Sequence, residues 1–260
     1  MTLINRLPTR TWNRLGVNET ALSWDENGTT EMSPLTVDVT GRKKVVRVEV
    51  NGENEFSRKK VTINAQSETS VTVIEVLSTE NNLAVETELN VKENALVRLI
   101  QVQRSEEKSL VYNKVTSFCD ESGRVELLQV FPGKGDIYSD SLIELTGDKS
   151  SFKSDIGYLG QREQTVDINL VVNHYGKSTE SEINASGALK DSSSKIFRGT
   201  IDFKTGSSDS VGNEKESVLM LGDGVINKTV PLILCAEENV VGNHGATIGE
   251  LRSEEHTSEL

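Results

Sequence analysis

Leu83-Ala-Val-Glu-Thr-Glu-Leu-Asn-Val91 alternates apolar and polar side chains along most of its length. The run before it, Val71-Thr-Val-Ile-Glu-Val76, and the run after it, Leu96-Val-Arg-Leu-Ile-Gln-Val102, keep a similar period of two. Successive side chains of a β-strand point to opposite faces, so this period predicts strands with one buried face. The three neighbouring runs therefore predict an all-β fold.

The same alternation continues through the chain from about residue 36. Further runs start roughly every 10 to 17 residues and are separated by Gly, Asn, Asp and Ser; they are Val46–Val50, Val125–Phe131, Val166–Val172, Ile196–Phe203, Val218–Leu221 and Val230–Cys235. No amphipathic helix pattern interrupts the series. We therefore expect many short strands in one continuous β architecture.

Three all-β architectures fit such a series: a sandwich, a barrel and a β-solenoid. Sandwiches and barrels commonly use tight Asn-Gly or Asp-Gly hairpins, but the connectors here are more often polar runs such as Ser105–Ser109 and Ser207–Glu216. About a dozen short strands without a domain break favour a solenoid, in which each coil stacks on the last. No fixed sequence period is visible, so periodicity alone favours the solenoid only modestly.

Residues 1–34 have a different character and predict a short irregular or helical lead-in. This segment carries Trp12 and Trp24 without sustained alternation, and Pro34 marks its expected boundary. We expect its aromatic side chains to dock on the larger body that begins at residue 35.

Composition excludes several classes of protein. The net charge is −12, which argues against a nucleic-acid partner because phosphate binding uses a basic surface. The sequence contains no run of about 18 apolar residues, so it predicts no membrane span. Met1–Pro8 also lacks the apolar segment of a secretion signal. We therefore expect a cytoplasmic protein with neither nucleic acid nor membrane as partner.

The stretch Pro231–Leu251 holds the main candidate site residue. His244 is followed by Gly245, Ala246 and Gly249, which predicts a turn where another backbone or a ligand can approach the imidazole. From these residues alone, His244 is either a structural corner residue or a metal or interface contact. His174 ends an apolar run, and we expect a half-exposed turn residue there.

The two cysteines predict packing rather than chemistry. Cys119 and Cys235 lie far apart in sequence and form no CxxC pair, which fits a reducing compartment. Each follows or ends an apolar run, so we expect both to behave as small buried hydrophobes. They cannot by themselves supply the four thiolates that commonly hold an iron–sulfur cluster.

No motif for catalysis is present. Gly133-Lys-Gly135 lacks the spacing of a phosphate-binding loop, and no nucleophile elbow or zinc-binding helix motif occurs. Some β-helices are carbohydrate-active enzymes, but these need Asp or Lys/Arg clustered on one sheet, and the sequence does not assemble such a cluster. A carbohydrate-active β-helix enzyme and a purely structural solenoid both stay open as alternatives.

The C-terminal third resembles the SufB/SufD family of iron–sulfur cluster assembly proteins, and SufD more than SufB. The resemblance covers about residues 5–251 and is strongest after about residue 165. The residues that carry it are Val172–Ser181, Ala188–Ser193, Phe197–Phe203, Val218–Leu221, Pro231–Leu251 and the early Leu7–Leu15.

The resemblance implies a fold and a role. The family core is a right-handed parallel β-helix, and its members act as non-catalytic scaffold subunits of a SufBCD-type complex. It implies a SufB-like subunit, or a second copy of the chain, bound through the β-helix, and a SufC-like ATPase bound through a C-terminal helical segment. His244 stands at the position of a histidine proposed to hold the nascent cluster, while Gly242 stands where the family often has a cysteine. We therefore expect no stably bound cofactor on this chain alone and a transient iron–sulfur cluster in the complex.

The tail Arg252–Leu260 departs from the family pattern. It matches the translation of a common sequencing-adapter oligonucleotide, so we exclude it from the fold and do not count His256 as a site residue. We expect the natural chain to continue past Leu251 into the helical segment that binds the ATPase. The β-helix core is accordingly predicted over residues 35–251.

Overall fold

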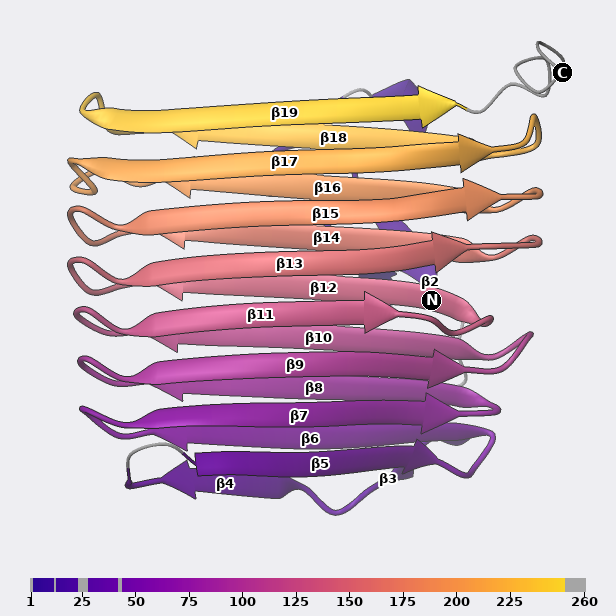
Figure 1. The fold of residues 1–260 in the computed structure, drawn as a ribbon, viewed down its shortest axis with the longest axis horizontal. Helices are drawn as coiled ribbons and strands as arrows, with labels where there is room; N and C mark the ends of the chain where they lie inside the picture. The colour runs from indigo at the N-terminus through magenta and orange to yellow at the C-terminus, as the bar shows by residue number, and fades with distance from the viewer. Residues whose placement is uncertain (1, 12, 23–27, 42–43, 251–260) are drawn as a thin grey trace, which may run out of the picture.

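The chain folds into two parallel β-sheets that stack face to face (Figure 1). The computed structural model describes all residues except 1, 12, 23–27, 42–43 and 251–260. Trp12 and Trp24, whose docking we predict, and the tail 252–260 lie outside the described residues.

We call the two sheets sheet I and sheet II. Sheet I contains β3 (Thr30–Glu31), β4 (Leu35–Val39), β6 (Phe56–Ala65), β8 (Asn82–Val91), β10 (Leu110–Cys119), β12 (Asp136–Leu145), β14 (Thr165–His174), β16 (Ser194–Phe203) and β18 (Ile226–Cys235). Sheet II contains β5 (Lys44–Gly52), β7 (Ser70–Thr79), β9 (Leu96–Ser105), β11 (Arg124–Phe131), β13 (Ser151–Gly160), β15 (Glu180–Lys190), β17 (Ser210–Leu221) and β19 (Val240–Glu250).

From β5 onward, consecutive strands alternate between the sheets, and each pairs in parallel with the strand two places along the chain. Leu110 of β10, for example, lies between Asn82 of β8 and Asp136 of β12. One coil of the chain therefore contributes one strand to each sheet, and successive coils stack. The predicted all-β fold and parallel β-helix are confirmed.

All the alternating runs that predict strands lie within observed strands. The expectation of no amphipathic helix is also confirmed for the described residues, where the helical element is the short 3-10 turn η1 (Asn13–Leu15). Nowhere in the described part of the chain is a helix long and apolar enough to cross a bilayer. One predicted connector is wrong: Ser210–Glu216 belongs to β17. Its inward positions include glutamates, which hide the alternation.

The turns on one side of the solenoid repeat a backbone conformation. Asn94, Ser122 and Lys149 all have a positive φ, of 56°, 53° and 59°. Each donates its backbone N–H to a carbonyl oxygen in the next coil, as Asn94 does to Glu121 at 3.0 Å. The left-handed residue at these corners therefore extends the stacking from the strands into the turns.

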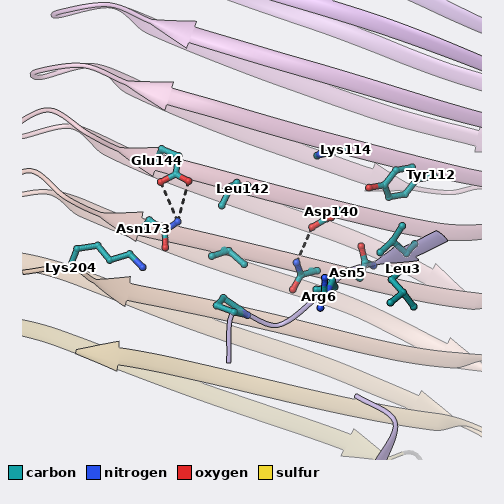
Figure 2. A pocket seen from close by; sticks show the side chains of 14 residues that line it. Leu3, Asn5, Arg6, Tyr112, Lys114, Asp140, Leu142, Glu144, Asn173 and Lys204 are labelled. Carbon is teal, nitrogen blue, oxygen red and sulfur yellow. Dashed lines mark hydrogen bonds between the residues drawn. The ribbon is translucent and has the colours of Figure 1, made fainter. Parts of the chain in front are cut away.

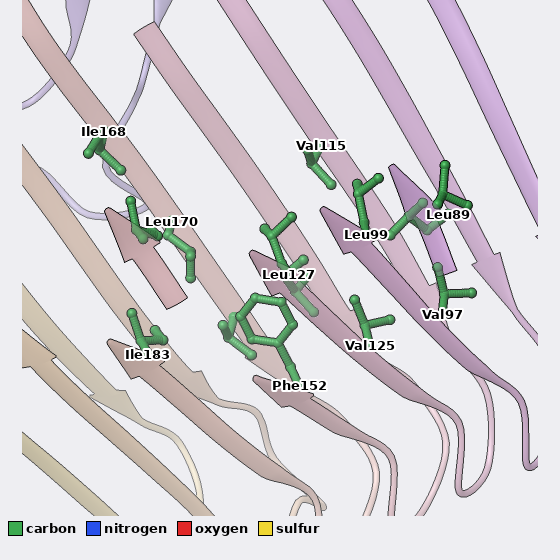
Figure 3. Close-up of a cluster of buried hydrophobic side chains, with 14 of the residues drawn as sticks. Leu89, Val97, Leu99, Val115, Val125, Leu127, Phe152, Ile168, Leu170 and Ile183 are labelled. Atoms are coloured by element: carbon green, nitrogen blue, oxygen red, sulfur yellow. The ribbon is translucent and has the colours of Figure 1, made fainter. Parts of the chain in front are cut away.

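The core fills the space between the sheets (Figure 3). Leu99 and Leu127 point inward from sheet II, and Val115 and Leu170 point inward from sheet I. Leu127 is 2% exposed, whereas the next residue, Leu128, lies on the outer face and is 38% exposed. The period of two in the sequence thus places alternate side chains inside and outside the solenoid.

A polar network interrupts this apolar interior. Gln101 Nε2 donates to Glu75 Oε2 at 2.7 Å, and Asn113 and Gln129 donate to Gln101 Oε1 at 2.7 and 2.9 Å. Thr87 Oγ1 also donates to the Glu75 carboxylate. All five residues are fully buried or nearly so. Burial raises the pKa of Glu75 to about 6, although hydrogen bonds from Gln101 and Thr87 oppose the rise.

The N-terminal segment folds back onto the outer face of sheet I. Its two short strands, β1 (Thr2–Ile4) and β2 (Thr20–Leu22), pair antiparallel and cover the side chains of Tyr112 and Tyr138. The fully buried Arg198 anchors the segment: its Nε donates to the Val17 carbonyl oxygen at 2.6 Å, and its guanidinium pairs with Asp167. Part of the outer face of sheet I is therefore covered by the N-terminal segment.

Replacing Leu127 with Ala should lower the free energy of unfolding by about 2–5 kcal/mol, because it opens a cavity in a closely packed interior. Leu128→Ala is the matched control and should change stability by less than about 1 kcal/mol, because its side chain faces solvent. Urea denaturation followed by circular dichroism measures both. Equal losses for the two variants would contradict the inward register of Leu127.

Replacing Glu75 with Gln should stabilise the protein in a pH-dependent way. Because the folded-state pKa is raised, protonated Glu75 stabilises the fold below its ordinary value of 4.5, and this contribution is lost as the pH rises through about 6. The pKa difference corresponds to about 2 kcal/mol. Denaturation should show Glu75→Gln more stable than the parent by about that amount at pH 8, with no difference near pH 4.5. Glu93→Gln, at an exposed position, is the control and should gain no stability at pH 8 relative to pH 4.5. If Glu75→Gln were as stable as the parent at both pH values, the raised pKa of Glu75 would be refuted.

Candidate functional site

The candidate site lies at the end of the solenoid formed by β18 and β19, which we call the open end. These strands occupy the last positions of the two sheets (Figure 1), and among the described residues no strand pairs with their outer edges. Most residues of β19 are exposed, including Ile248 at 59%. At the opposite end, Val48 and Val50 of β5 are buried. The two ends therefore differ in how far their inner surfaces are covered.

His244 lies in the middle of β19 and is exposed. The predicted turn at this residue is wrong: the Gly and Ala residues around it continue as an extended strand, because β17 supplies a complete parallel partner. His244 pairs in register with Glu214 of β17.

The register shows which face of β19 is turned inward. A Cβ at Gly242 would lie 2.9 Å from Ile233 Cγ2 and 3.2 Å from the Phe203 ring, so position 242 faces the interior. Side chains two residues apart share a face. His244 therefore belongs to the inward row of the last described coil, where it is exposed because no further coil covers it.

Glu214 occupies the inward position next to His244 in the preceding coil of sheet II. Its side chain is 5% exposed, and its Oε2 atom has no hydrogen-bond partner among the described residues. Burial, with a smaller contribution from the charge of Glu216, raises the pKa of Glu214 to about 8. A carboxyl group buried without a partner is costly to ionise.

Glu216, two residues further along β17, has the partners that Glu214 lacks. It forms a buried ion pair with Lys195, accepts a hydrogen bond from Thr229 Oγ1 at 2.6 Å, and accepts another from the Tyr158 hydroxyl at 3.2 Å. Lys195 also donates to Thr229 at 3.2 Å. Burial lowers the pKa of Lys195, and Glu216 opposes that shift. The interior beneath the open end thus holds two carboxyl groups and one ammonium group.

No sequence pattern singled out Lys195, Glu214 or Glu216 as site residues. Glu214 and Glu216 fall in a stretch that resembles a solvated connector, and Lys195 begins a strand that reads as ordinary. A period-two reading of Asn213–Ser217 places both glutamates on one face. That signal could have marked them as a pair.

His174 is a structural residue. It is fully buried, not half-exposed as predicted, because Thr179 in the turn and Ser181 in β15 enclose its ring. The two ring nitrogens lie 2.7 Å from Thr179 Oγ1 and 2.9 Å from Ser181 Oγ, and the ring packs against Phe203 at a tilt of 39°. Burial lowers the pKa of His174 to about 4. His174 lies on β14, two strands below β18, and both of its ring nitrogens have hydrogen-bond partners.

The two cysteines have different surroundings. Cys119 is buried as predicted, and burial raises the pKa of its thiol to about 12. Cys235 is exposed, so its predicted burial is wrong: it ends β18, where no further strand covers it. Within the described residues, no three His, Cys, Asp or Glu side chains converge on one point. The chain therefore offers no complete metal-binding set of its own in that part.

A separate groove of about 440 Å³ lies on the outer face of sheet I beside the N-terminal segment (Figure 2). Its acidic side chains already have partners: Asn169 donates to Asp140 at 2.8 Å and Asn173 donates to Glu144 at 3.2 Å. Burial raises the pKa of Asp140. The groove does not contain His244 or any other predicted site residue.

Removing the charge of Lys195 should be strongly destabilising. Lys195→Met leaves Glu216 buried beside Glu214 without a cation, and we expect a loss of about 3–5 kcal/mol in the free energy of unfolding. The double variant Lys195→Met, Glu216→Met removes both charges and should recover most of that loss. Urea titrations of the parent and both variants measure the effect. A double variant as unstable as Lys195→Met alone would show that the ion pair does not explain the loss.

Comparison with known proteins agrees with the resemblance seen in the sequence. Residues 48–256 match the family model described as "SUF system FeS cluster assembly, SufBD core domain". The chain is also 31% identical over 117 residues to the "Iron-sulfur cluster assembly protein SufD" of Bacillus subtilis (strain 168). That alignment covers 45% of this chain and 27% of the relative, so the comparison spans about a quarter of the relative's length. Because the family match extends over most of the chain, this SufD-like protein belongs to the SufB/SufD family of iron–sulfur cluster assembly proteins.

Proposed function

We propose that the chain is a non-catalytic scaffold subunit of a SufBCD-type complex that assembles iron–sulfur clusters. The family match supports the role in cluster assembly. The observation that carries the scaffold role is the open end, where a parallel β-stack presents an unpaired edge and exposed apolar side chains. Exposed strand edges of this kind pair readily with another chain.

The proposed partner at the open end is a SufB-like subunit or a second copy of this chain. Ile248, on the inward row of β19, is 59% exposed, and Val240 of β19 and Ile233 of β18 are partly buried against the core. An apolar surface next to free backbone hydrogen-bonding groups suits a strand from a partner. The proposed SufC-like ATPase would bind a helical segment that follows the β-helix, as the family resemblance implies.

His244 is the proposed contact with the nascent cluster. Its imidazole is exposed at the open end, where a partner would meet it. Gly242 supplies no thiolate at the position where the family often has cysteine, so other cluster ligands would come from the partner. The cluster is cargo: we propose that it forms transiently in the complex and that the chain alone binds no cofactor stably.

The absence of catalysis is likewise a proposal, and the outer face of sheet I supports it. Asp167, which lies on that face, is paired with Arg198 and accepts a hydrogen bond from Asn5 Nδ2 at 2.7 Å. Asp140 and Glu144 are also hydrogen-bonded. These carboxyl groups have structural partners, which favours a scaffold over the carbohydrate-active alternative. Free Cys119 and Cys235 support a proposed cytoplasmic location, where thiols stay reduced.

The test is co-expression with SufB-like and SufC-like subunits, followed by affinity purification and mass measurement in solution. The parent chain should retain the SufB-like partner or form a dimer. Ile248→Asp should weaken the association about tenfold or more, because it places a charge in an apolar contact. Val45→Asp is the matched control: Val45 is 70% exposed on β5 at the opposite end and should retain the partner.

Two results would contradict the proposal. One is the lack of any association in the parent chain. The other is an equal effect of Ile248→Asp and Val45→Asp, which would remove the open end as the interface.

A further inference from the structure

We propose that Glu214 is a second metal-ligating side chain at the open end and forms, with His244, a site for a divalent transition-metal ion. The identity of the ion as Fe²⁺ rests on the proposed function; the site itself rests on the geometry of β17 and β19. Sequence patterns and the family resemblance single out His244 alone.

The register places the two side chains in one inward column. Glu214 and His244 are direct partners in the parallel pair β17–β19. Adjacent strands lie about 4.8 Å apart, so side chains at paired positions on one face are within reach of a common ion. The column continues downward through Ile183 of β15, which is fully buried. Glu214 is therefore the last buried position of the column, and His244 is the exposed position above it.

Glu214 lacks the partners that a buried carboxylate requires. Its neighbour Glu216 has Lys195, Thr229 and Tyr158, whereas Glu214 Oε2 has no hydrogen-bond partner in the described part of the chain. Lys195 neutralises one carboxylate of the two. A cation at Glu214 would supply the missing positive charge, and buried charges in proteins are normally paired or coordinate a metal.

Gly199 makes room for the carboxylate. It lies on β16, across the interior, and a Cβ there would be 2.3 Å from Glu214 Oε2 and 2.5 Å from Oε1. Any larger residue at position 199 would displace the carboxylate. The absence of a side chain at Gly199 thus leaves the space that the two oxygens occupy.

The donor set suits a borderline metal ion. A carboxylate oxygen and an imidazole nitrogen are both ligands of Fe²⁺ and Zn²⁺. Two side chains do not complete the coordination, and no third His, Cys, Asp or Glu converges there among the described residues. Water would complete the shell in the isolated chain, and side chains of the proposed partner would replace it in the complex.

Metal titration of the full chain tests the proposal. Isothermal titration with Fe²⁺ under anaerobic conditions gives the dissociation constant, and visible absorption with Co²⁺ reports whether nitrogen and oxygen ligands are engaged. Glu214→Gln keeps the shape of the side chain and removes the charged ligand, so binding should weaken about tenfold or more. His244→Gln should have an effect of similar size. Glu182→Gln, on the exposed outer face of β15, should bind as the parent does.

Gly199→Ala provides a variant that keeps both ligands. The added methyl group should displace the carboxylate and weaken binding, while circular dichroism confirms that the β-fold is intact. The proposal is overturned if the parent chain binds neither ion, or if Glu214→Gln binds within twofold of the parent. Dependence on Glu214 without any association with a SufB-like partner would leave this site standing and overturn the proposed function alone.

Discussion

Parallel stacking in register is the constraint on which this structure depends. Each coil hydrogen-bonds to the coils on either side, so every inward residue has a neighbour above and below in the same column. Val97, Val125 and Phe152 form one such column in sheet II. The packing and hydrogen-bond partners of an inward residue therefore come largely from its two neighbours in the column. A residue at the end of a column has such a neighbour on one side only.

The interior accepts polar groups only where a column supplies partners for them. Around Glu75 the neighbours are amides and hydroxyls, so each donor meets an acceptor and the carboxyl group remains hydrogen-bonded in a dry environment. Around Glu214 the column offers Ile183 below and His244 above. The Glu75 carboxyl group finds its hydrogen-bond partners within the fold, whereas Glu214 Oε2 has no partner among the described residues. This difference separates a structural network from a candidate site.

The sequence predicts the strands well where inward residues are apolar and poorly elsewhere. Leu83–Val91 alternates apolar and polar residues along most of the sequence, and the burial of its side chains largely alternates in β8. The strands β12, β13 and β15 carry serine, glycine or asparagine among their residues, which weakens the pattern. The fixed period expected of a solenoid is also absent, because turn lengths vary: Phe56 pairs with Asn82, 26 residues on, whereas Ser194 pairs with Ile226, 32 residues on. Burial of His174 depends on corner contacts that no local pattern encodes.

One inward column of sheet II is apolar in its first coils and carries polar side chains toward β19. This change explains why the candidate site lies at the open end. Val73, Leu99 and Leu127 are apolar, and Ser154, Ile183, Glu214 and His244 follow them toward β19. A histidine in the middle of that column would be enclosed by packed side chains, as His174 is at its corner. At the last described coil the imidazole can meet a partner or an ion while its strand is still held by β17. No further coil covers the imidazole among the described residues, so a strand held by β17 can present it without a flexible loop.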